Sequence, residues 1–399
     1  MINPIIIENK DENLIYELNR INGIKRGTLK EIHISDLHFG VLDPAYQYTI
    51  LEEQFFSKIE DIDFDILSIN GDIYDHKFMS NSDAVMYAIK AIDRAVGICR
   101  NKNATLILIH GTYEHDANQL KLFYHYLQDS TVDIRIVENI KFEYIKNAKI
   151  LCIPELYGKG KEYYENCLYN SGLYDSVFMH GTIKNAIYGK DKEDLDSARE
   201  PVFSIDNFCM CRGPIISGHV HVQQCLNGYF YYTGSPYRWC FGEEEPKGFL
   251  IVVHDLDTGY HYTHFEEIKS YRYDTINLDH MLNLDPKNVI EHIDNLKKNG
   301  IDYIRVEFTN IPNDLEQSNL ELLKNYYRTN SFVKLKIENL NNKKVLEQNQ
   351  EFLEKFNQYE YILDSSLSEY DILTRYINDQ KGYKYISVEE LKKIIEEGE

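Results

Sequence analysis

Five short apolar runs in this chain each end in acidic or imidazole side chains, and this pattern constrains the fold most strongly. Three of them, KEIHISD, FDILSIN and TLILIH, occupy Lys30–Asp36, Phe64–Asn70 and Thr105–His110 and have the length and composition of strands. Between them lie two segments of helical length, Pro44–Glu60 and Asn81–Asn101. Strand–helix–strand alternation on this scale predicts parallel strands joined by crossover helices, and therefore an α/β fold.

The polar clusters that follow these runs contain the residue types that bind metal ions. They are Asp36-Leu37-His38, Gly71-Asp72-Ile73-Tyr74-Asp75, Gly111-Thr112-Tyr113-Glu114-His115-Asp116, His180-Gly181 and Gly218-His219-Val220-His221. In open α/β sheets, ligands bind beyond the carboxyl ends of the strands. Side chains two positions apart on an extended backbone point to the same side, as in D-x-H and H-x-H. We therefore expect the five clusters to meet at one site.

This combination of ligands indicates which metals such a site would take. Mixed imidazole and carboxylate ligands suit manganese, iron or zinc better than magnesium or calcium. A carboxylate shared by two ions would hold them roughly 3.5–4 Å apart, as in two-metal hydrolytic sites that activate water and polarise phosphoryl oxygens. The other histidines without such neighbours are expected to be structural or exposed: His33, His76, His125, His254, His261, His264, His280 and His292.

The 399 residues are enough for two or three domains. Residues 1–29 form an N-terminal extension outside the regular pattern. Residues 30–276 form the main domain, whose second half is rich in strand-like runs, and this order predicts a layered sheet sandwich with helices outside. The runs are DIRIVE, AKILCIPE, SVFMHG, GPIISGHV, YFYYTGS and GFLIVVHDL.

The pattern of predicted elements changes after Asp285-Pro286, from runs of strands to helices and strands in alternation. Residues 277–344 are expected to form a small α+β unit that caps the main domain. Its predicted elements are a helix at Lys287–Lys298, the strand IDYIRVEFT, a helix at Leu315–Arg328 and the strand FVKLKIENL. Residues 345–399 are predicted to be amphipathic helices, with apolar stripes in Leu363–Ile377 and Val388–Ile395.

The net charge of −21 counts against binding nucleic acid by simple electrostatic attraction, because that binding needs Lys and Arg to displace counterions. Cations held at a carboxylate-rich metal site or a basic partner protein would meet the objection, and solubility alone is the plainer account of the charge. No apolar stretch approaches the ~20 residues that cross a bilayer, and the seven cysteines are scattered. A cytoplasmic protein without a membrane partner is expected.

The five clusters resemble the calcineurin-like metallophosphoesterase signature, which consists of D-x-H, G-D-x-x-D, G-N-H-D/E, H and G-H-x-H. The resemblance covers about residues 30 to 270. It implies a four-layer α/β/β/α sandwich that holds two divalent metal ions per chain. The implied ligands are Asp36, His38 and His221 for one ion, Asp72 as the bridge, and His180 and His219 for the other.

The same resemblance implies that His115 stabilises or protonates the leaving oxygen and that Asp116 orients His115. One position departs from the signature, because the chain has Gly111-Thr112-Tyr113-Glu114-His115 where the family has Gly-Asn-His. Aligned on the histidine, Glu114 replaces the asparagine ligand, whereas aligned on the glycine, Thr112 does. A carboxylate is the better ligand, so Glu114 is favoured. The alternative is a protein whose second metal site is not functional, so that it binds its partner molecule without catalysing a reaction.

A further run resembles the SbcD-type exonuclease subunit. It comprises Thr233-Gly234-Ser235-Pro236-Tyr237-Arg238, then Phe241-Gly242-Glu243, then Lys247-Gly248-Phe249, followed by a cap and C-terminal helices. The alternative is that Gly-Ser-Pro is only a turn and that the Lys and Glu lie on the surface. The resemblance implies a DNA exonuclease or endonuclease that processes DNA ends in repair, recombination or replication, and Arg238 is a candidate substrate-binding residue.

The SbcD-type resemblance also implies Mn²⁺ as the cofactor, a homodimer, and an SMC-like coiled-coil ATPase partner of SbcC type that docks on the C-terminal helices. The helix containing Val85, Ile89, Ile92 and Val96 is a candidate dimer surface, and packing against its own sheet explains the same apolar face equally well. Two other functions stay open at this point. One is a phosphatase or phosphodiesterase that acts on another substrate, and the other is a catalytically silent scaffold subunit.

Overall fold

The computed structural model describes residues 25–156, 161–187, 201–277, 286–308, 333–337 and 387–396, together with isolated positions outside these ranges. The chain divides into two compact units. One comprises residues 1–276, 285–306 and 321–335, and the other comprises residues 277–284, 307–320 and 336–399. The predicted helices at Leu315–Arg328 and Leu363–Ile377, and most of the predicted N-terminal extension, lie outside the described ranges.

The first sheet has six strands in the order β14-β13-β1-β2-β3-β4. Its strands are β1 (Thr28–Ile34), β2 (Ile66–Asn70), β3 (Thr105–Ile109), β4 (Asp133–Val137), β13 (Gly248–Asp255) and β14 (His261–Glu267). Strands β1 to β4 are parallel, which confirms the pairing predicted from the crossover helices. Strands β13 and β14 extend the sheet in antiparallel order. Every residue of β2 and β3 is buried, as is usual for parallel strands that are covered on both faces.

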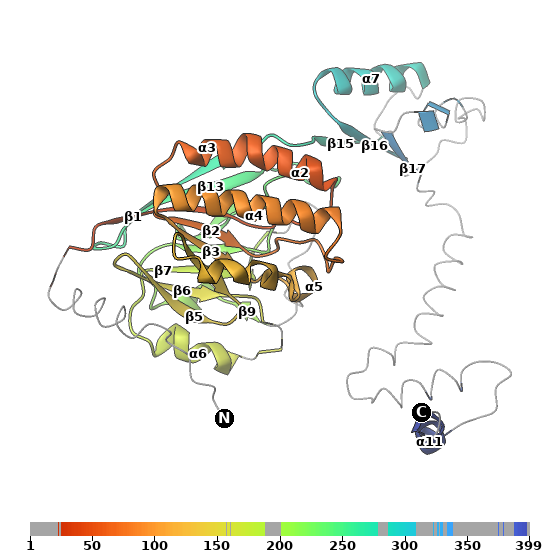
Figure 1. Cartoon of the computed structure of the whole chain (residues 1–399). Helices are drawn as coiled ribbons and strands as arrows, with labels where there is room; N and C mark the ends of the chain where they lie inside the picture. The colour runs from red at the N-terminus through yellow and green to blue at the C-terminus, as the bar shows by residue number, and fades with distance from the viewer. Residues whose placement is uncertain are drawn as a thin grey trace. The chain divides into compact units, whose positions relative to one another are not determined.

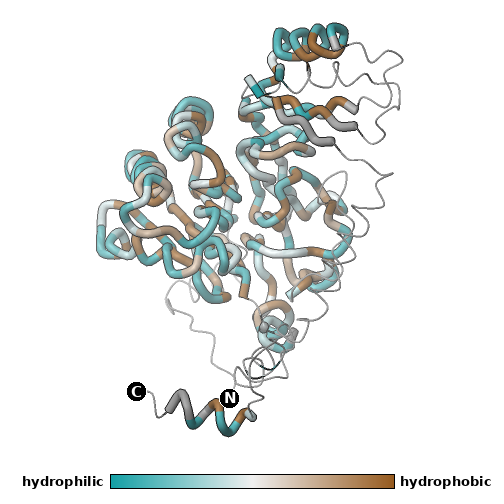
Figure 2. The backbone as a smooth tube through the Cα atoms, turned by 90° about the vertical axis from the view of Figure 1, so that its right-hand side faces the viewer, coloured by the Kyte–Doolittle hydropathy of each residue, from teal (hydrophilic) through white to brown (hydrophobic). Residues whose placement is uncertain are grey.

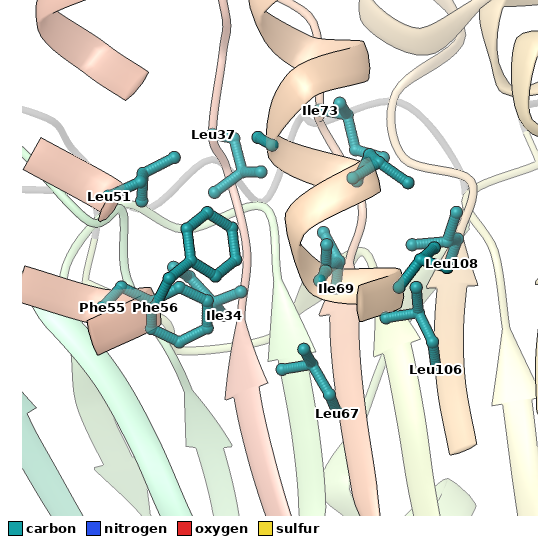
Figure 3. Close-up of a cluster of buried hydrophobic side chains, with 14 of the residues drawn as sticks. Ile34, Leu37, Leu51, Phe55, Phe56, Leu67, Ile69, Ile73, Leu106 and Leu108 are labelled. Carbon is teal, nitrogen blue, oxygen red and sulfur yellow. The ribbon is translucent and has the colours of Figure 1, made fainter. Parts of the chain in front are cut away.

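Helices cover one face of this sheet (Figure 1). They are α2 (Pro44–Leu51), the π-helical η1 (Glu52–Phe56), α3 (Ser57–Glu60) and α4 (Asp83–Lys102), and they confirm both predicted crossover helices. Figure 3 shows how Phe55 and Phe56 of η1 meet Ile34 and Leu67 of the sheet in one buried cluster. Val85, Ile92 and Val96 of α4 are buried in the same cluster. The apolar face of α4 therefore packs on its own sheet.

The second sheet also has six strands, in the order β11-β12-β10-β7-β6-β5. They are β5 (Lys141–Ile145), β6 (Ala148–Ile153), β7 (Ser176–His180), β10 (Ile215–Gly218), β11 (Gln224–Leu226) and β12 (Phe230–Tyr232). Ile66 and Ile107 of the first sheet share a core cluster with Ile150 and Phe178 of the second. The helix α6 (Lys161–Tyr169) contributes to another cluster, together with Val177 and other residues of the second sheet. The fold is a mixed α/β fold, as predicted.

Shorter elements complete the first unit. They are α5 (Tyr113–Asp116), η2 (Gln119–Gln128), β8 (Thr182–Ile183), β9 (Val202–Phe203) and η3 (Ile205–Phe208). A separate three-stranded sheet, β15 (Tyr273–Asn277), β16 (Tyr303–Phe308) and β17 (Val333–Ile337), follows together with the helix α7 (Pro286–Lys298). Figure 2 shows α7 with hydrophobic and hydrophilic turns, and Val289 and Ile293 on its apolar side are buried.

The helices and strands predicted between residues 286 and 337 are confirmed for α7, β16 and β17, and the helix at Val388–Ile395 is confirmed as α11 (Val388–Glu396). Among the described residues, no helix combines the length and the apolar composition that a membrane span requires.

Candidate metal centre

The five predicted clusters converge on one site. Asp36 and His38 follow β1, Asp72 follows β2, and the remaining histidines come from α5, from the end of β7 and from the loop after β10. The described residues contain four overlapping groups of side chains that could hold a metal ion, and within each group the ligand atoms all lie within 4.8 Å of one another. The groups are Asp36, His38 and His221; His38, Asp72 and His115; Asp36, Asp72 and His180; and Glu155, His180 and His219.

The backbone at this site is held in an uncommon conformation. Nine described residues other than glycine have positive φ, and four of them are candidate ligands: Asp36 (54°), His38 (41°), Asp72 (52°) and His219 (91°). Such conformations cost of order 1–3 kcal/mol each and cluster at functional sites, where the surrounding structure imposes them. Here the loops support one another, since the backbone N–H groups of Asp36 and His38 donate to the carbonyls of Gly71 and Asp72, each over 3.0 Å.

Asp72 lies at the middle of the site. Its Oδ2 is 3.3 Å from Nε2 of His180, 3.6 Å from Nε2 of His38 and 4.0 Å from Nε2 of His115. Its Oδ1 accepts a hydrogen bond of 2.6 Å from the backbone N–H of Thr112. Two ligand atoms that bind the same ion at about 2.1 Å each, in a tetrahedral arrangement, are ~3.4 Å apart. The separations from Asp72 to His180 and His38 therefore suit donors around an ion better than direct hydrogen bonds.

His38 provides the clearest test of whether this centre fits a metal ion. The residue is 2% exposed, and among the described residues neither of its ring nitrogens has a hydrogen-bond partner at normal distance. Leaving buried polar atoms unpaired costs roughly 1–3 kcal/mol each. Carboxylate oxygens of Asp72 and Asp75 lie near the two nitrogens, each at 3.6 Å. A cation between His38 and Asp72 would satisfy both groups, so the donor set fits a divalent metal.

The ring of His180 is oriented for ligation. Its Nδ1 donates to the carbonyl of Asn70 over 2.7 Å, so Nε2 is the nitrogen that faces Asp72. A hydrogen bond of this kind on the far nitrogen is usual for histidines that bind metals. The imidazole is fully buried among carboxylates, so its position is fixed by the protein.

A layer of buried polar side chains supports His221. Its Nδ1 lies 3.8 Å from Oε1 of Glu243, and Nζ of Lys247 lies 3.3 Å from the same oxygen. Lys247 is 1% exposed and donates to the carbonyl of His221 over 3.0 Å and to Oγ of Ser235 over 2.9 Å. The alternative that Lys247 is a surface residue is therefore wrong. The single tryptophan, Trp239, packs edge-on against His221, with ring centroids 4.5 Å apart.

Arg238, the candidate substrate-binding residue, makes hydrogen bonds within the protein. Its guanidinium donates to the backbone carbonyls of Glu244 and Glu245, and its backbone N–H donates to Ser270. These bonds fix the loop that carries Trp239 and Glu243. A role for Arg238 in binding substrate stays a prediction.

Glu155, which the motif analysis did not single out, lies among the predicted ligands. It follows β6 and is 3% exposed, and its Oε2 is 3.5 Å from Nδ1 of His219 and 3.7 Å from Nε2 of His180. Thr112 Oγ1 donates to the same oxygen over 2.9 Å. The signal was present in the sequence, because Glu155 ends the apolar run AKILCIPE just as Asp36 ends KEIHISD.

The structure places the two alternatives for the missing asparagine very differently. Glu114 is exposed on α5 and belongs to none of the four donor groups found among the described residues. Thr112, at the N-cap of α5, is 7% exposed and contacts both Asp72 and Glu155. Because α5 is helical, the residue beside His115 turns away from the centre. We therefore revise the expected position of Glu114 and place Thr112 where the glycine alignment puts it.

His115 and Asp116 are also arranged differently from the expectation. His115 Nδ1 donates to the backbone carbonyl of Asp75, and its ring is partly exposed, with Nε2 toward Asp72. The fully buried Asp116 instead accepts backbone N–H groups from the two loops that follow β2 and β3: those of Asp72, Ile73, Tyr74 and Gly111. The carbonyl of Asp75 thus orients His115, and Asp116 joins the loops.

Burial and neighbouring charges shift the pKa values of the side chains at the centre in different directions. Burial holds the pKa of Asp36 above its usual value, although the charge of His180 opposes this. Burial alone would lower the pKa of His180, but the charge and hydrogen bond of Asp72 raise it well above its usual value. Burial and the neighbouring charges of His38 and Lys247 hold the pKa of His221 well below its usual value. Metal ligands must be deprotonated to bind an ion, so binding of a cation at this centre is coupled to pH.

Comparison with known proteins gives one informative sequence relative. No family model matches the chain. The protein named "Putative phosphoesterase 244L" of Invertebrate iridescent virus 6 is 26% identical over 233 residues, which cover 56% of this chain and 76% of that protein. This similarity, together with the buried donor groups, supports a hydrolase of the phosphoesterase type.

Several solved structures align with part of the chain, among them two at low TM-scores. A Thermotoga maritima protein solved by NMR covers 60% of this chain and 99% of its own, with 14% identity and a TM-score of 0.27. A cold-active protein-tyrosine phosphatase of a Shewanella species covers 59% of this chain and 80% of its own, with 12% identity and a TM-score of 0.26. At such low TM-scores these likenesses carry no argument about function.

Proposed function

We propose that this chain is a metal-dependent phosphodiesterase with two divalent ions, of the calcineurin-like type, and that it acts on DNA. The observation that carries the metal part is His38, whose two buried ring nitrogens lack hydrogen-bond partners at normal distance among the described residues and face carboxylates of Asp72 and Asp75. The two six-stranded sheets with a shared core, and helices packed on their outer faces, support the family's four-layer sandwich.

In this proposal Asp36, His38 and His221 hold one ion, His180 and His219 hold the other, and Asp72 contacts both. When bound, such ions activate water and polarise the phosphoryl oxygens of the substrate, and Mn²⁺ is the ion proposed. The protein residues fix the geometry. Asp116 holds the loops that carry Asp72 and His115, and the hydrogen bond from His180 to Asn70 keeps Nε2 directed inward.

His115 is the proposed proton donor to the leaving oxygen. Its ring is accessible from solvent at 31% side-chain exposure, whereas the side chain of His38 is 3% exposed. The bond from Nδ1 to the carbonyl of Asp75 leaves Nε2 as the only nitrogen that can reach a substrate. In this role His115 would give the proton on Nε2 to the leaving oxygen. Solvent would then supply a new proton to Nε2.

The DNA-specific part of the proposal rests on the run from Thr233 to Phe249 and on the elements that follow it. In the structure this run supports the centre: Lys247 and Ser235 hold the loop of His221, and Tyr237 donates to the carbonyl of Leu37. We propose an SbcD-type nuclease subunit that works as a homodimer with an SbcC-type ATPase. A basic partner would offset the −21 charge of this chain, which by itself repels the DNA backbone.

A phosphoesterase with a non-DNA substrate is the second candidate, and the strong acidity favours it. One assay separates the two. The purified chain with Mn²⁺ is incubated with linear duplex DNA, single-stranded DNA, a chromogenic phosphomonoester and a cyclic nucleotide, with and without a chelator. We expect chelator-sensitive cleavage of DNA. Hydrolysis of only the monoester or the cyclic nucleotide would rule out the nuclease.

The same assay includes His115→Ala, with His125→Ala as the matched control at an exposed histidine. Loss of a general acid commonly lowers the rate by 10²–10⁴-fold, so we expect a fall of about that size in DNA cleavage with the metal content preserved. Equal cleavage by the two variants would contradict the role of His115. DNA binding without cleavage by the wild-type chain would favour the silent scaffold.

A further inference from the structure

We propose that Glu155 is a ligand of the second metal ion and that it gives this site a carboxylate where the family's pattern has a neutral amide. The inference deepens the proposed two-metal centre and rests on it for its catalytic meaning. Its evidence is the position of Glu155 relative to His180 and His219, together with Thr112, which contacts both Glu155 and Asp72.

The separations among the donor atoms suit a common ion. Oε2 of Glu155 lies 3.5 Å from Nδ1 of His219 and 3.7 Å from Nε2 of His180. Oδ2 of Asp72 lies 3.3 Å from the same nitrogen of His180. Ligands at about 2.1 Å from one ion, tetrahedrally arranged, are ~3.4 Å apart. These separations cluster around that value, whereas a good direct N–H···O bond would be about 2.9 Å.

The orientation of His180 supports the same conclusion. Its Nδ1 donates to the carbonyl of Asn70, so Nε2 is the ring nitrogen that faces Asp72 and Glu155. Nε2 of His180 and the carboxylates of Asp72 and Glu155 therefore surround one position, which suits a positively charged partner. A divalent cation supplies that partner, and Glu155, Asp72 and His180 then become ligands together.

Thr112 explains how Glu155 can replace the missing asparagine. Its backbone N–H donates to Oδ1 of Asp72 over 2.6 Å, and its Oγ1 lies 2.9 Å from Oε2 of Glu155. Thr112 therefore connects the shared carboxylate of the first sheet with a carboxylate from the second sheet. A threonine hydroxyl is a weaker ligand than a carboxylate, so its part is to position Glu155.

The third carboxylate changes the charge of the centre. Asp36, Asp72 and Glu155 together bring three negative charges against the four positive charges of two divalent ions. An amide in place of Glu155 would leave one more positive charge uncompensated in a buried site, where charge is costly. We therefore expect Glu155 to tighten binding of the second ion rather than of the first.

The test measures Mn²⁺ binding directly. Metal-free wild type and Glu155→Gln are titrated with Mn²⁺ by calorimetry and electron paramagnetic resonance, and the fluorescence of Trp239 is followed. Trp239 is the single tryptophan, and its ring lies 5.0 Å from that of His38 and 4.5 Å from that of His221, so its quenching reports the first ion. Glu165→Gln, at an exposed glutamate of α6, is the matched control.

We expect two Mn²⁺ per wild-type chain and at least a 10–100-fold weaker second ion in Glu155→Gln, with Trp239 quenching and Glu165→Gln unchanged. Equal second-ion affinity in wild type and Glu155→Gln would overturn the proposal, as would a loss caused by Glu114→Gln instead. If Glu155→Gln does not fold by circular dichroism, Glu155→Asp must show the weakened second ion.

The outcomes also separate this inference from the proposed function. If Glu155→Gln weakens the second ion but the wild-type chain cleaves no DNA, the ligand assignment stands and the nuclease proposal fails. If the wild-type chain binds fewer than two Mn²⁺ ions, both fail. If DNA is cleaved at the same rate and with the same metal content by wild type and Glu155→Gln, only the inference about Glu155 fails.

Discussion

Replacing Asp72 with asparagine should remove almost all hydrolytic activity and weaken both metal ions. The Asp72 carboxylate lies within 3.6 Å of ring nitrogens of His38 and His180, which belong to different ions in the proposed centre. Asparagine keeps the shape and tolerates the left-handed backbone of this position, where φ is 52°. A charged ligand is lost for each ion at once. If each ion is bound ~10–100-fold more weakly, activity falls by about 10²–10⁴-fold at limiting metal.

The measurement combines metal analysis with steady-state kinetics on the substrate that the wild type cleaves best. Asp61→Asn, at an exposed aspartate at the end of α3, is the control and should retain wild-type metal content and rate. Excess Mn²⁺ should restore only part of the activity of Asp72→Asn, because the charge between the ions remains lost. Full activity and two tightly bound ions in Asp72→Asn would show that Asp72 is not shared.

Replacing Gly71 with alanine should destabilise the fold and displace His180. Gly71 has φ +85°, and a Cβ there would lie 2.2 Å from Nδ1 of His180 and 2.8 Å from the Cα of Gly111. The ring of His180 cannot move away without breaking its bond to the carbonyl of Asn70. Overpacking commonly costs 1–3 kcal/mol and the left-handed backbone adds about 1 kcal/mol, so we expect a loss of about 2–4 kcal/mol in unfolding free energy.

Chemical denaturation of metal-free protein measures this loss without interference from ion binding. The control is Gly97→Ala in the middle of α4, where a Cβ meets no atom within 4 Å. Alanine is the better helix former, so Gly97→Ala should stabilise the protein by roughly 0.5–1 kcal/mol. If Gly71→Ala is as stable as wild type and binds two ions, the close approach of β2 and β7 at this point is not a constraint.

The sequence predicted the site largely because parallel strands place their carboxyl ends at the same edge. The predicted ligands Asp36 and Asp72 follow neighbouring strands, and His180 ends β7, a strand whose core residue Phe178 packs against the first sheet. Apolar runs and the polar residues that end them were sufficient to find these positions. The pairing of β1 with β2 brings Asp36 and Asp72 together, and the packing of the second sheet on the first brings His180 to them.

Glu114 and Glu155 show what the order of residues along the chain does not determine. Glu114 was favoured at the position of the family's asparagine because it precedes His115 and because a carboxylate is the better ligand. Residues 113–116 form the helix α5, so neighbours in sequence point in different directions. Glu155 was overlooked because its partners His180 and His219 are distant in sequence. The pairing of β6 with β7 brings it near His180, and the pairing of β7 with β10 brings His219 to the same place.

The supporting polar layer could not be predicted either, because its importance depends on burial. Lys247 and Glu243 were visible as part of a motif, and a surface position was the alternative that the sequence left open. The structure buries Lys247 between Ser235, Glu243 and the carbonyl of His221. Burial of a lysine is tolerated where such partners surround it, and here these partners fix the loop that carries His221.

Anomalous diffraction from crystals grown with Mn²⁺ is the most direct test of the two-ion centre. The account predicts two peaks about 3.5–4 Å apart on either side of the Asp72 carboxylate, the spacing of two-metal hydrolytic sites. One peak should lie near His38 and His221, and the other near His180, His219 and Glu155. Crystals grown with saturating Mn²⁺ that show no anomalous peak at Asp72, or only one, would contradict a two-ion centre.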